Sequence, residues 1–417
     1  MILNEVITDI AAGPFGSNLK IECFVPEGFP IIDGANLKGF KVTDNVTKFV
    51  TEEKARSLHR SIAKRGDVVS TISGTIGQIA YIPDDSKYEE YLVSQRQFRI
   101  TFDTEKVNIP FLVYYFHSRI GQSKIFAFAN QVGVPALAQP LKNFRNIEVN
   151  FPSIDVQNKI ASILSSFDDK IAVNKKICEN LEAQAQALFK HWFVDFAPFK
   201  DGKFVESELG LIPEGWRVGR LGQVTSNITD GVHNTVKDVA NGGFYLLSCK
   251  NIKGGIIAKG DDERTIDEET FIKLRKRTKL QKGDILLSSV GTIGEMVLLN
   301  DDLSNIEFQR SVAMIKPDSD IITPHFLFYS LMNQKEKIIH SAHGAVQQCL
   351  FISDIANFIT IIPPIEEINK FTNVVKVLVD NKTCFEKENI RLSTLRDTLL
   401  PKLMSGEIKV NDVNEKC

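Results

Sequence analysis

The stretch Gly66-Asp-Val-Val-Ser-Thr-Ile-Ser-Gly-Thr-Ile-Gly77 has a near copy later in the chain, Gly283-Asp-Ile-Leu-Leu-Ser-Ser-Val-Gly-Thr-Ile-Gly294. In both stretches a Gly-Asp pair precedes a largely apolar, β-branched run, and Gly-Thr-Ile-Gly follows. The run predicts a buried strand, and the paired glycines predict a tight turn into the next strand. The chain therefore contains a duplicated β-rich unit.

Further matches extend this duplication along most of the chain, with an offset that falls from 218 to 211 residues. Small loop insertions would produce such a drift, and collinear matches are hard to obtain by chance. An old duplication with one inert copy is the alternative. The paired segments are Leu3-Asn-Glu-Val6 with Leu221-Gly-Gln-Val224, Asn36-Leu-Lys-Gly39 with Asn251-Ile-Lys-Gly254, Gln95-Arg96 with Gln309-Arg310, and Pro152 and Asn158-Lys159 with Pro363 and Asn369-Lys370.

Each copy ends in a proline-marked break that is followed by a long amphipathic stretch. Apolar residues recur there in steps of 4 and 3, which predicts two helices of about 38 residues, roughly 57 Å long, with a coiled-coil seam. We expect them to pack antiparallel; the alternative is that each packs on its own domain. The seams are Val156, Ile160, Ile163, Phe167, Ile171, Asn174, Cys178, Leu181, Ala185, Leu188 and Trp192, and Phe371, Val374, Leu378, Lys382, Phe385, Asn389, Leu392, Arg396, Leu399 and Leu403.

Asn174 and Asn389 interrupt the two seams. A polar seam residue costs stability but can fix the register of a helix pair. If these asparagines align in an antiparallel pair, Trp192 should lie near Phe371. We therefore predict a register role for both asparagines.

The predicted fold class is α+β, with two tandem mixed α/β domains, two long antiparallel coiled-coil helices between them, and a pseudo-twofold repeat. The predicted boundaries are 1–150 for the first domain, 151–196 for the first helix, 197–216 for a linker rich in Gly, Pro and charge, 217–361 for the second domain, and 362–417 for the second helix and tail.

Composition limits the possible cellular setting. The sequence has no signal peptide pattern and no apolar run of about 18 residues, so we expect no membrane association. Its six cysteines are far apart and form no C-x-x-C pair. This spacing argues against zinc sites and a disulfide scaffold, and it predicts a cytoplasmic protein.

The motifs of common catalytic sites are missing. There is no phosphate-binding G-x-x-x-x-G-K-[ST] loop, no G-x-S-x-G elbow, no Asn-Pro-Pro-aromatic tetrapeptide and no glycine-rich methyl-donor loop. His340 and His343 lack an evident third metal ligand and are interpreted as surface residues. We therefore predict a binding protein without catalytic residues, metal or bound cofactor.

The net charge of −2, taken alone, counts against nucleic-acid binding, but basic residues cluster at matching places. No acidic residue falls within 54–65 or 271–282. Such cationic stripes suit DNA phosphate contacts, which position a protein without reading sequence. Solvated helix faces are the alternative. The residues are Lys54, Arg56, Arg60, Lys64 and Arg65, and Lys273, Arg275, Lys276, Arg277, Lys279 and Lys282.

Polar residues near these landmarks could read base edges, because Arg pairs with guanine and Asn or Gln with adenine. The Gly-Thr-Ile-Gly turns could contact phosphate through backbone N–H groups or be structural corners. Gln95-Arg96 and Gln309-Arg310 could alternatively be buried. The candidates are Asn18, Lys20, Asn36, Lys38, Ser73, Thr75, Gln95, Arg96 and Gln97 in the first copy, and His233, Asn234, Lys250, Asn251, Lys253, Thr292, Gln309, Arg310, Gln347 and Gln348 in the second.

These landmarks resemble the specificity subunit of type I restriction-modification systems. The resemblance covers essentially the whole chain and includes Glu208-Leu-Gly-Leu-Ile-Pro-Glu-Gly-Trp216, the two Gly-Asp to Gly-Thr-Ile-Gly blocks, and the proline breaks before long helices. It implies two target-recognition domains that read the halves of a bipartite site in double-stranded DNA, with the helices as spacer.

The resemblance also implies partners. These are two methylation subunits, which would carry S-adenosylmethionine, and motor-nuclease restriction subunits. Because the copies differ at most candidate base-contacting positions, the target should be asymmetric. Alternatives are the specificity subunit of a methylation-only or two-subunit type II-like system, a free-standing DNA-binding regulator, an enzyme acting alone, and an interaction scaffold unrelated to DNA.

Overall fold

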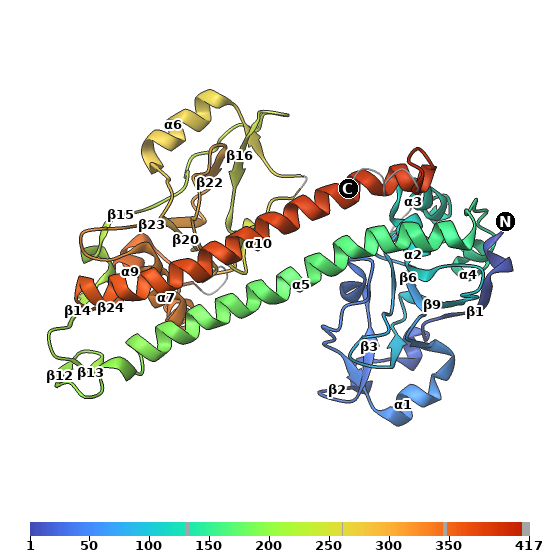
Figure 1. The fold of residues 1–417 in the computed structure, drawn as a ribbon, viewed down its shortest axis with the longest axis horizontal. Helices are drawn as coiled ribbons and strands as arrows, with labels where there is room; N and C mark the ends of the chain where they lie inside the picture. The colour runs from blue at the N-terminus through green and yellow to red at the C-terminus, as the bar shows by residue number, and fades with distance from the viewer. Residues whose placement is uncertain (131–133, 261, 345–347, 411–417) are drawn as a thin grey trace. The chain divides into compact units, whose positions relative to one another are not determined.

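The computed structural model describes residues 1–130, 134–260, 262–344 and 348–410. It divides into two compact units (Figure 1). Unit 1 comprises Met1–Val173 and Asn389–Cys417, and unit 2 comprises Asn174–Glu388. Each unit therefore contains one β-rich domain and part of both long helices. No helix in the described ranges is both long and apolar enough to cross a membrane.

Unit 1 is built on a four-stranded antiparallel sheet in the order β1-β9-β6-β7. The strands are Ile7–Ala12, Gln97–Phe102, Val68–Thr71 and Ile79–Tyr81. Its main core cluster combines sheet residues with α2 (Ile109–His117), α3 (Arg119–Phe126) and α4 (Pro140–Arg145).

A five-stranded sheet of order β2-β4-β3-β8-β5 completes the β-structure around this core. Its strands are Phe24–Val25, Phe49–Val50, Phe29–Ile32, Glu90–Val93 and Ile62–Lys64, and β3 runs parallel to β8. Smaller elements are η1 (Leu3–Glu5), η2 (Gly16–Asn18), η3 (Ile21–Cys23), η4 (Gly34–Leu37), α1 (Glu52–Ser57), η5 (His59–Ser61), β10 (Ala129–Asn130) and β11 (Ala136–Leu137).

Unit 2 repeats the central sheet in the order β15-β23-β20-β21. The strands are Thr225–Asp230, Val312–Pro317, Ile285–Ser288 and Met296–Leu298. A three-stranded sheet of order β19-β16-β22 contains Thr265–Ile266, Phe244–Leu247 and Ile306–Phe308, and β16 runs parallel to β22 as β3 does to β8. The first strand of each central sheet has the same irregularity, at Ile7/Asp9 and Thr225/Asn227.

The remaining elements of unit 2 are η7 (Leu221–Gln223), η8 (Cys249–Asn251), β14 (Arg217–Arg220), β17 (Ile252–Lys253), β18 (Ile256–Ile257), β24 (Ile359–Ile362), α6 (Glu268–Thr278), α7 (Pro324–Asn333), α8 (Lys335–His340) and α9 (Ile352–Asn357). The predicted linker contains η6 (Ala197–Phe199) and a hairpin of β12 (Phe204–Ser207) and β13 (Gly210–Pro213). Phe199 packs 4.9 Å from the buried Trp216, so this segment is part of a folded core.

Backbone hydrogen bonds correct the alignment of the two copies by one residue at Gln95-Arg96. The amide of Ser94 donates to Ile32 as that of Gln309 donates to Leu247. The carbonyl of Arg96 accepts from Ile72 as that of Ser311 accepts from Ser289. Ser94 is therefore equivalent to Gln309, Gln95 to Arg310, and Arg96 to Ser311.

The two long helices are α5 (Ile154–Phe193) and α10 (Ile365–Ser405). They run antiparallel within each unit. In unit 1, Ile160 and Leu164 share a core cluster with Leu400 and Leu403. In unit 2, Trp192 lies 6.2 Å from Phe371, as predicted from the seam.

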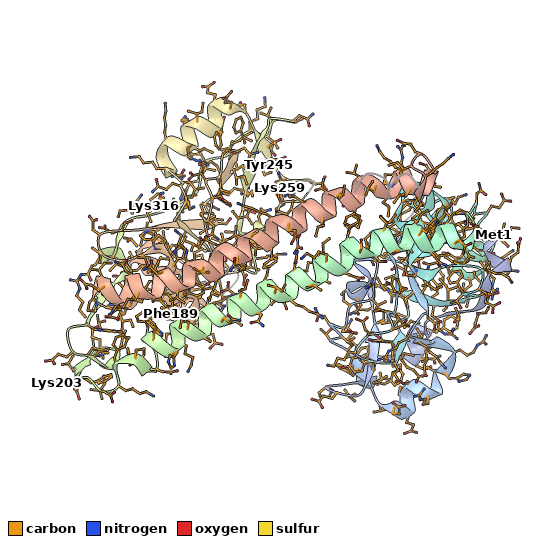
Figure 2. The ribbon with its side chains drawn as sticks, in the orientation of Figure 1. Met1, Phe189, Lys203, Tyr245, Lys259 and Lys316 are labelled. Atoms are coloured by element: carbon orange, nitrogen blue, oxygen red, sulfur yellow. The ribbon has the colours of Figure 1, made fainter. Side chains whose placement is uncertain are left out.

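Towards the helix ends the buried row departs from the predicted seam. Val374 was predicted in the seam but is 49% exposed, while Val375 is buried. In α5 the buried residues at the C-terminal end are Phe189, labelled in Figure 2, and Phe193. They join a core cluster that contains sheet residues, so the helices pack both on each other and on their domain. This second contact shifts the buried face.

Candidate nucleic-acid interface

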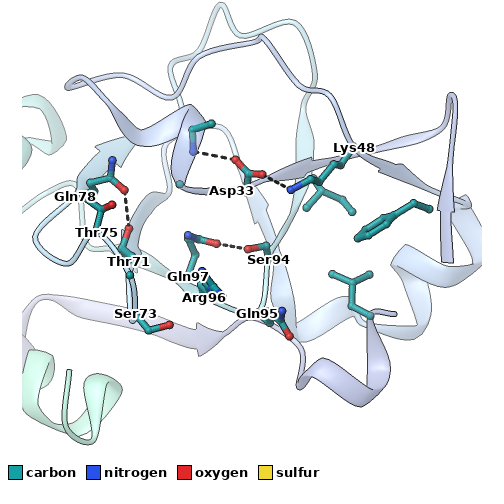
Figure 3. Close-up of a pocket in the computed structure, with 16 residues that line it drawn as sticks. Asp33, Lys48, Thr71, Ser73, Thr75, Gln78, Ser94, Gln95, Arg96 and Gln97 are labelled. Atoms are coloured by element: carbon teal, nitrogen blue, oxygen red, sulfur yellow. Dashed lines mark hydrogen bonds and ion pairs between the residues drawn. The ribbon is translucent and has the colours of Figure 1, made fainter. Parts of the chain in front are cut away.

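A concave site of about 440 Å³ lies in unit 1 beside the first Gly-Thr-Ile-Gly turn (Figure 3). The β6–β7 connection contributes Ser73 and Thr75, the turn before β9 contributes Gln95 and Arg96, and β9 begins with Gln97. Residues that are more than twenty positions apart thereby line one hollow. The hollow brings together five residues of the predicted set, Ser73, Thr75, Gln95, Arg96 and Gln97.

Gln95 and Arg96 are exposed, so the alternative that they are buried is wrong. They form a two-residue turn because the backbone N–H of Gln97 donates to the backbone carbonyl of Ser94 across it, at 3.0 Å. Gln97 itself is buried, and its side chain is hydrogen-bonded to the hydroxyl of Ser94. The structure therefore gives Gln97 a supporting position below the turn, not the exposed position that base reading requires.

The segment before β2 forms one rim of the hollow and presents the predicted Asn18 and Lys20 on the surface. A β-carbon on Gly16 would lie 2.8 Å from the Gln95 side chain, so this segment packs against the 95–96 turn. Phe15 and Ile21 are 82% and 85% exposed on the same segment. Sequence reasoning missed both residues, because an apolar letter does not reveal exposure.

Asn36 and Asn251 occupy equivalent buried positions at 3% and 2% exposure. The Asn36 amide accepts from the Asp33 N–H (3.0 Å) and donates to Thr43 and Asn45 carbonyls (3.1 and 3.2 Å). Such buried, satisfied amides hold a loop closed. Base contact would require these bonds to break, so the structure corrects their predicted role to a structural one.

Asn251 forms the corresponding bonds: it accepts from the Ser248 N–H at 2.9 Å and donates to the Ala258 carbonyl at 2.9 Å. It also donates to Glu263 at 2.7 Å, which pairs with the exposed Lys250 at 3.1 Å. Lys38 and Lys253, two positions after each asparagine, are both exposed.

Unit 2 presents several predicted residues on its surface. His233, Asn234, Thr292 and Gln348 are exposed. His233 is paired with Asp230 at 2.6 Å, which turns part of its polar edge inward. Gln347 lies outside the described residues. Thr292 is in the turn equivalent to Thr75, and the exposed Arg310 is equivalent to Gln95.

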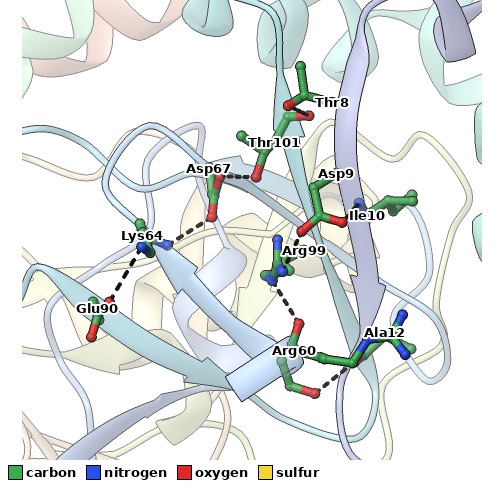
Figure 4. Close-up of polar contacts among 11 residues, drawn as sticks. Thr8, Asp9, Ile10, Ala12, Arg60, Lys64, Asp67, Glu90, Arg99 and Thr101 are labelled. Carbon is green, nitrogen blue, oxygen red and sulfur yellow. Dashed lines mark hydrogen bonds and ion pairs between the residues drawn. The ribbon is translucent and has the colours of Figure 1, made fainter. Parts of the chain in front are cut away.

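Acidic residues outside the 54–65 stretch, from the start of α1 and from residues 89–90, meet the first basic cluster. Arg56 pairs with Glu52 (2.8 Å) and Glu90 (2.6 Å), and Lys64 lies 3.8 Å from Glu90 (Figure 4). Arg65 donates to the Ser86 carbonyl at 2.7 Å and lies 3.8 Å from Glu89. The expected acid-free stripe is therefore corrected to a mixed surface.

Arg60 keeps an exposed side chain, while its carbonyl accepts from Arg99 at 2.9 Å. In the second cluster, Arg275 on α6 is ion-paired with the buried Glu307, so its guanidinium holds α6 on the sheet. The Arg277 guanidinium donates to the Asp230 carbonyl at 2.8 Å and also to Gly231. Lys276 is exposed on α6. Lys276 and Arg60 are therefore better placed for phosphate contact than Arg275.

The Gly-Asp pairs have a structural cause. Gly66 and Gly283 have φ of +85° and +91°, a backbone conformation that residues other than glycine rarely adopt. The Asp67 carboxylate accepts from the Lys64 N–H at 2.9 Å and from Thr101 at 2.6 Å (Figure 4). Asp284 accepts from the Gln281 N–H at 2.9 Å and pairs with Lys316. Burial raises the pKa of both carboxyl groups.

The family profile described as "Type I restriction modification DNA specificity domain" matches residues 26–183 and 213–391. The chain belongs to this family. The two matched segments correspond to the two copies of the duplication, and together they cover most of the sequence. The specificity-domain family thus accounts for the repeat, for the central sheets apart from β1, and for the first parts of the long helices.

Similar proteins carry related names. The MjaIX specificity subunit of a type I restriction enzyme from Methanocaldococcus jannaschii is 28% identical over 87% of this chain and 82% of that protein. The EcoBI specificity subunit of Escherichia coli is 25% identical over 77% of this chain and 70% of that protein. A crystal structure of the type I S subunit from M. genitalium shares the fold with a TM-score of 0.57, 17% identity, and coverage of 97% and 95%.

Proposed function

We propose that this specificity-family chain recognises an asymmetric bipartite site in double-stranded DNA and directs methylation and restriction subunits to it. The observation that carries the proposal is the presence of two equivalent recognition units in one chain. Each unit presents polar turns from the same two places of its central sheet. A reader of two separate half-sites requires such a duplication.

Differences between the equivalent turns support unlike half-sites. Gln95 of unit 1 is matched by Arg310 of unit 2, and Arg96 is matched by Ser311. Gln is suited to adenine and Arg to guanine, through two hydrogen bonds to the base edge. Two surfaces that carry different side chains at equivalent positions would select different bases, so the combined target is not a palindrome.

The partners follow from the family and remain part of the proposal. Two methylation subunits would bring S-adenosylmethionine and rotate the target adenine out of the duplex, because a base inside the stack is inaccessible to chemistry. Restriction subunits would join this assembly. This chain would contribute DNA recognition, with its own residues binding no cofactor.

The proposal is tested by methyl transfer from S-adenosylmethionine to DNA with the purified chain, the methylation subunits, and both together. We expect N6-methyladenine only with both, and only on duplexes that carry both half-sites. Arg96→Ala should relax the base preference within one half-site, whereas the exposed Lys106→Met should not. Methylation by the subunits alone with the same sequence preference would contradict the proposal.

A further inference from the structure

Equivalent buried tyrosines connect each domain to α5. Tyr114 on α2 donates its hydroxyl hydrogen to Asp168, and the buried Tyr329 on α7 lies within the electrostatic influence of Glu182. Burial and the neighbouring carboxylate raise the pKa of both tyrosines, so each hydroxyl stays a donor. The two tyrosines occupy the same position of the two copies.

Each carboxylate is also paired with a cation on α10. Asp168 pairs with Arg396 in unit 1, and Glu182 pairs with Lys382 at 2.8 Å in unit 2. The four charged side chains are only 15% to 22% exposed. An ion pair so shielded from water is costly to leave with one partner missing. Each pair therefore joins α5 to α10 at the level of its domain.

Each cation also lies near the residue that follows the repeated Asn-x-Lys-Gly segment. The Arg396 guanidinium lies 4.9 Å from the ring centre of Phe40, and that ring lies 4.5 Å from Tyr114. The Lys382 ammonium lies 3.6 Å from where a β-carbon on Gly255 would stand. Phe40 and Gly255 are equivalent positions, each two residues after an exposed lysine, Lys38 or Lys253.

From this repeated arrangement we infer that Arg396 and Lys382 are positioning residues for DNA recognition. Each fixes the lysine-bearing loop of its own unit to both long helices, through a tyrosine and a carboxylate. This inference rests on the proposed function. The chemistry differs between units, with Asp and Arg in one and Glu and Lys in the other, but in both a carboxylate on α5 is paired with a cation on α10 beside the equivalent tyrosine. Different side chains at the two places are expected if the function requires a fixed position of the loop and not one particular side chain.

Such a connection matters for specificity because base reading depends on hydrogen-bond geometry at the edge of a base. A loop that is free to tilt on its helices would still attract phosphate but would discriminate bases less well. Loss of the unit 1 connection should therefore affect one half-site, and loss of the unit 2 connection should affect the other.

The test uses Arg396→Met and Lys382→Met in the full chain, assembled with its methylation subunits. Methylation rates are compared on the cognate duplex and on duplexes with one altered base pair in either half-site. Arg396→Met should reduce discrimination at one half-site by about tenfold, within the range of a single base contact, and leave the other unchanged. Lys382→Met should show the reverse pattern. The exposed ion-pair variants Lys106→Met and Lys370→Met serve as controls and should change neither ratio.

Tyr114→Phe, which removes one hydroxyl, gives a milder variant if Arg396→Met does not fold, and Arg396→Lys should restore most of the discrimination. If the variants slow methylation equally on all duplexes, the residues are merely structural and the inference is overturned. If the wild-type complex methylates no duplex, the proposed function fails, and the inference fails with it.

Discussion

Asn251→Ala provides a quantitative test of the structural role assigned to the repeated asparagines. The substitution removes two neutral hydrogen bonds, with Ser248 and Ala258, and one bond to the Glu263 carboxylate. Neutral bonds contribute about 1 kcal/mol each and a bond to a charged group about 2 kcal/mol, so the expected loss in the free energy of unfolding is about 4 kcal/mol. Asn36→Ala, which removes three neutral bonds, should cost about 3 kcal/mol.

Urea denaturation followed by tryptophan fluorescence suits this measurement. The chain has two tryptophans, Trp192 and Trp216, and both lie in unit 2 with Asn251. With a typical urea dependence of about 2.5 kcal/mol per molar, the transition midpoint of Asn251→Ala should fall by roughly 1.5 M. The same substitution at the exposed Asn234 should leave the midpoint unchanged.

The structural role is refuted by the opposite pattern. An Asn251→Ala protein with an unchanged midpoint but weakened binding to cognate DNA would show that this side chain reads a base. Asn251→Asp separates the two cases further, because it preserves size but places a second carboxylate against Glu263. We expect it to destabilise unit 2 at least as much as alanine does.

Three further predictions concern other parts of the chain. Gly294→Ala should lower the free energy of unfolding by about 1–3 kcal/mol in denaturation curves, because φ is +89° and the new β-carbon would lie 2.8 Å from Ile339. Burial lowers the pKa of His117 below 6.5. Its contribution to stability is therefore present above pH 6.5 and is lost as the pH falls through its folded-state pKa. His117→Gln should reduce the resulting decline in melting temperature between pH 7 and pH 5. In binding titrations, Arg96→Ala should relax the preference at one base pair by about 1–3 kcal/mol. Lys276→Ala should weaken binding to all duplexes alike and reduce the salt dependence of binding. A sequence-selective effect of Lys276→Ala would contradict its phosphate role.

Much of the fold was predictable because its signals are local. Proline breaks and 4–3 periodicity predicted helices of about 38 residues, and the structure has helices of 40 and 41 residues. Antiparallel packing with Asn174 and Asn389 aligned predicted that Trp192 lies near Phe371, and the two rings are 6.2 Å apart. What periodicity did not reveal is the second set of contacts, with the domain core, that exposes Val374 and buries Val375.

The site was harder to predict because its character depends on long-range pairing. Glu90 and Glu307 neutralise basic residues from which they are more than twenty positions distant. The alignment of Gln95-Arg96 with Gln309-Arg310 was displaced because the same two letters recur one residue away from the equivalent turn. Only the strand hydrogen bonds fix the true register.

The repeated asparagines show why identity between copies was misleading. Asn36 and Asn251 were candidates because each is a polar residue near the repeated landmarks that could read a base edge, yet both are buried in the same loop-closing role. In a protein that reads two unlike half-sites, residues shared by the copies are expected to hold the fold. Residues that differ at equivalent exposed positions, such as Gln95 and Arg310, are the better candidates for base reading.

The most direct test of the account is single-molecule methylome sequencing of a host with this gene intact and deleted. We predict that deletion removes N6-methyladenine from one bipartite motif with two unlike halves. Loss of a palindromic motif would contradict the assignment of different bases to the two units. An unchanged methylome, in a host that expresses the methylation subunits, would contradict the central claim that this chain directs methylation to DNA.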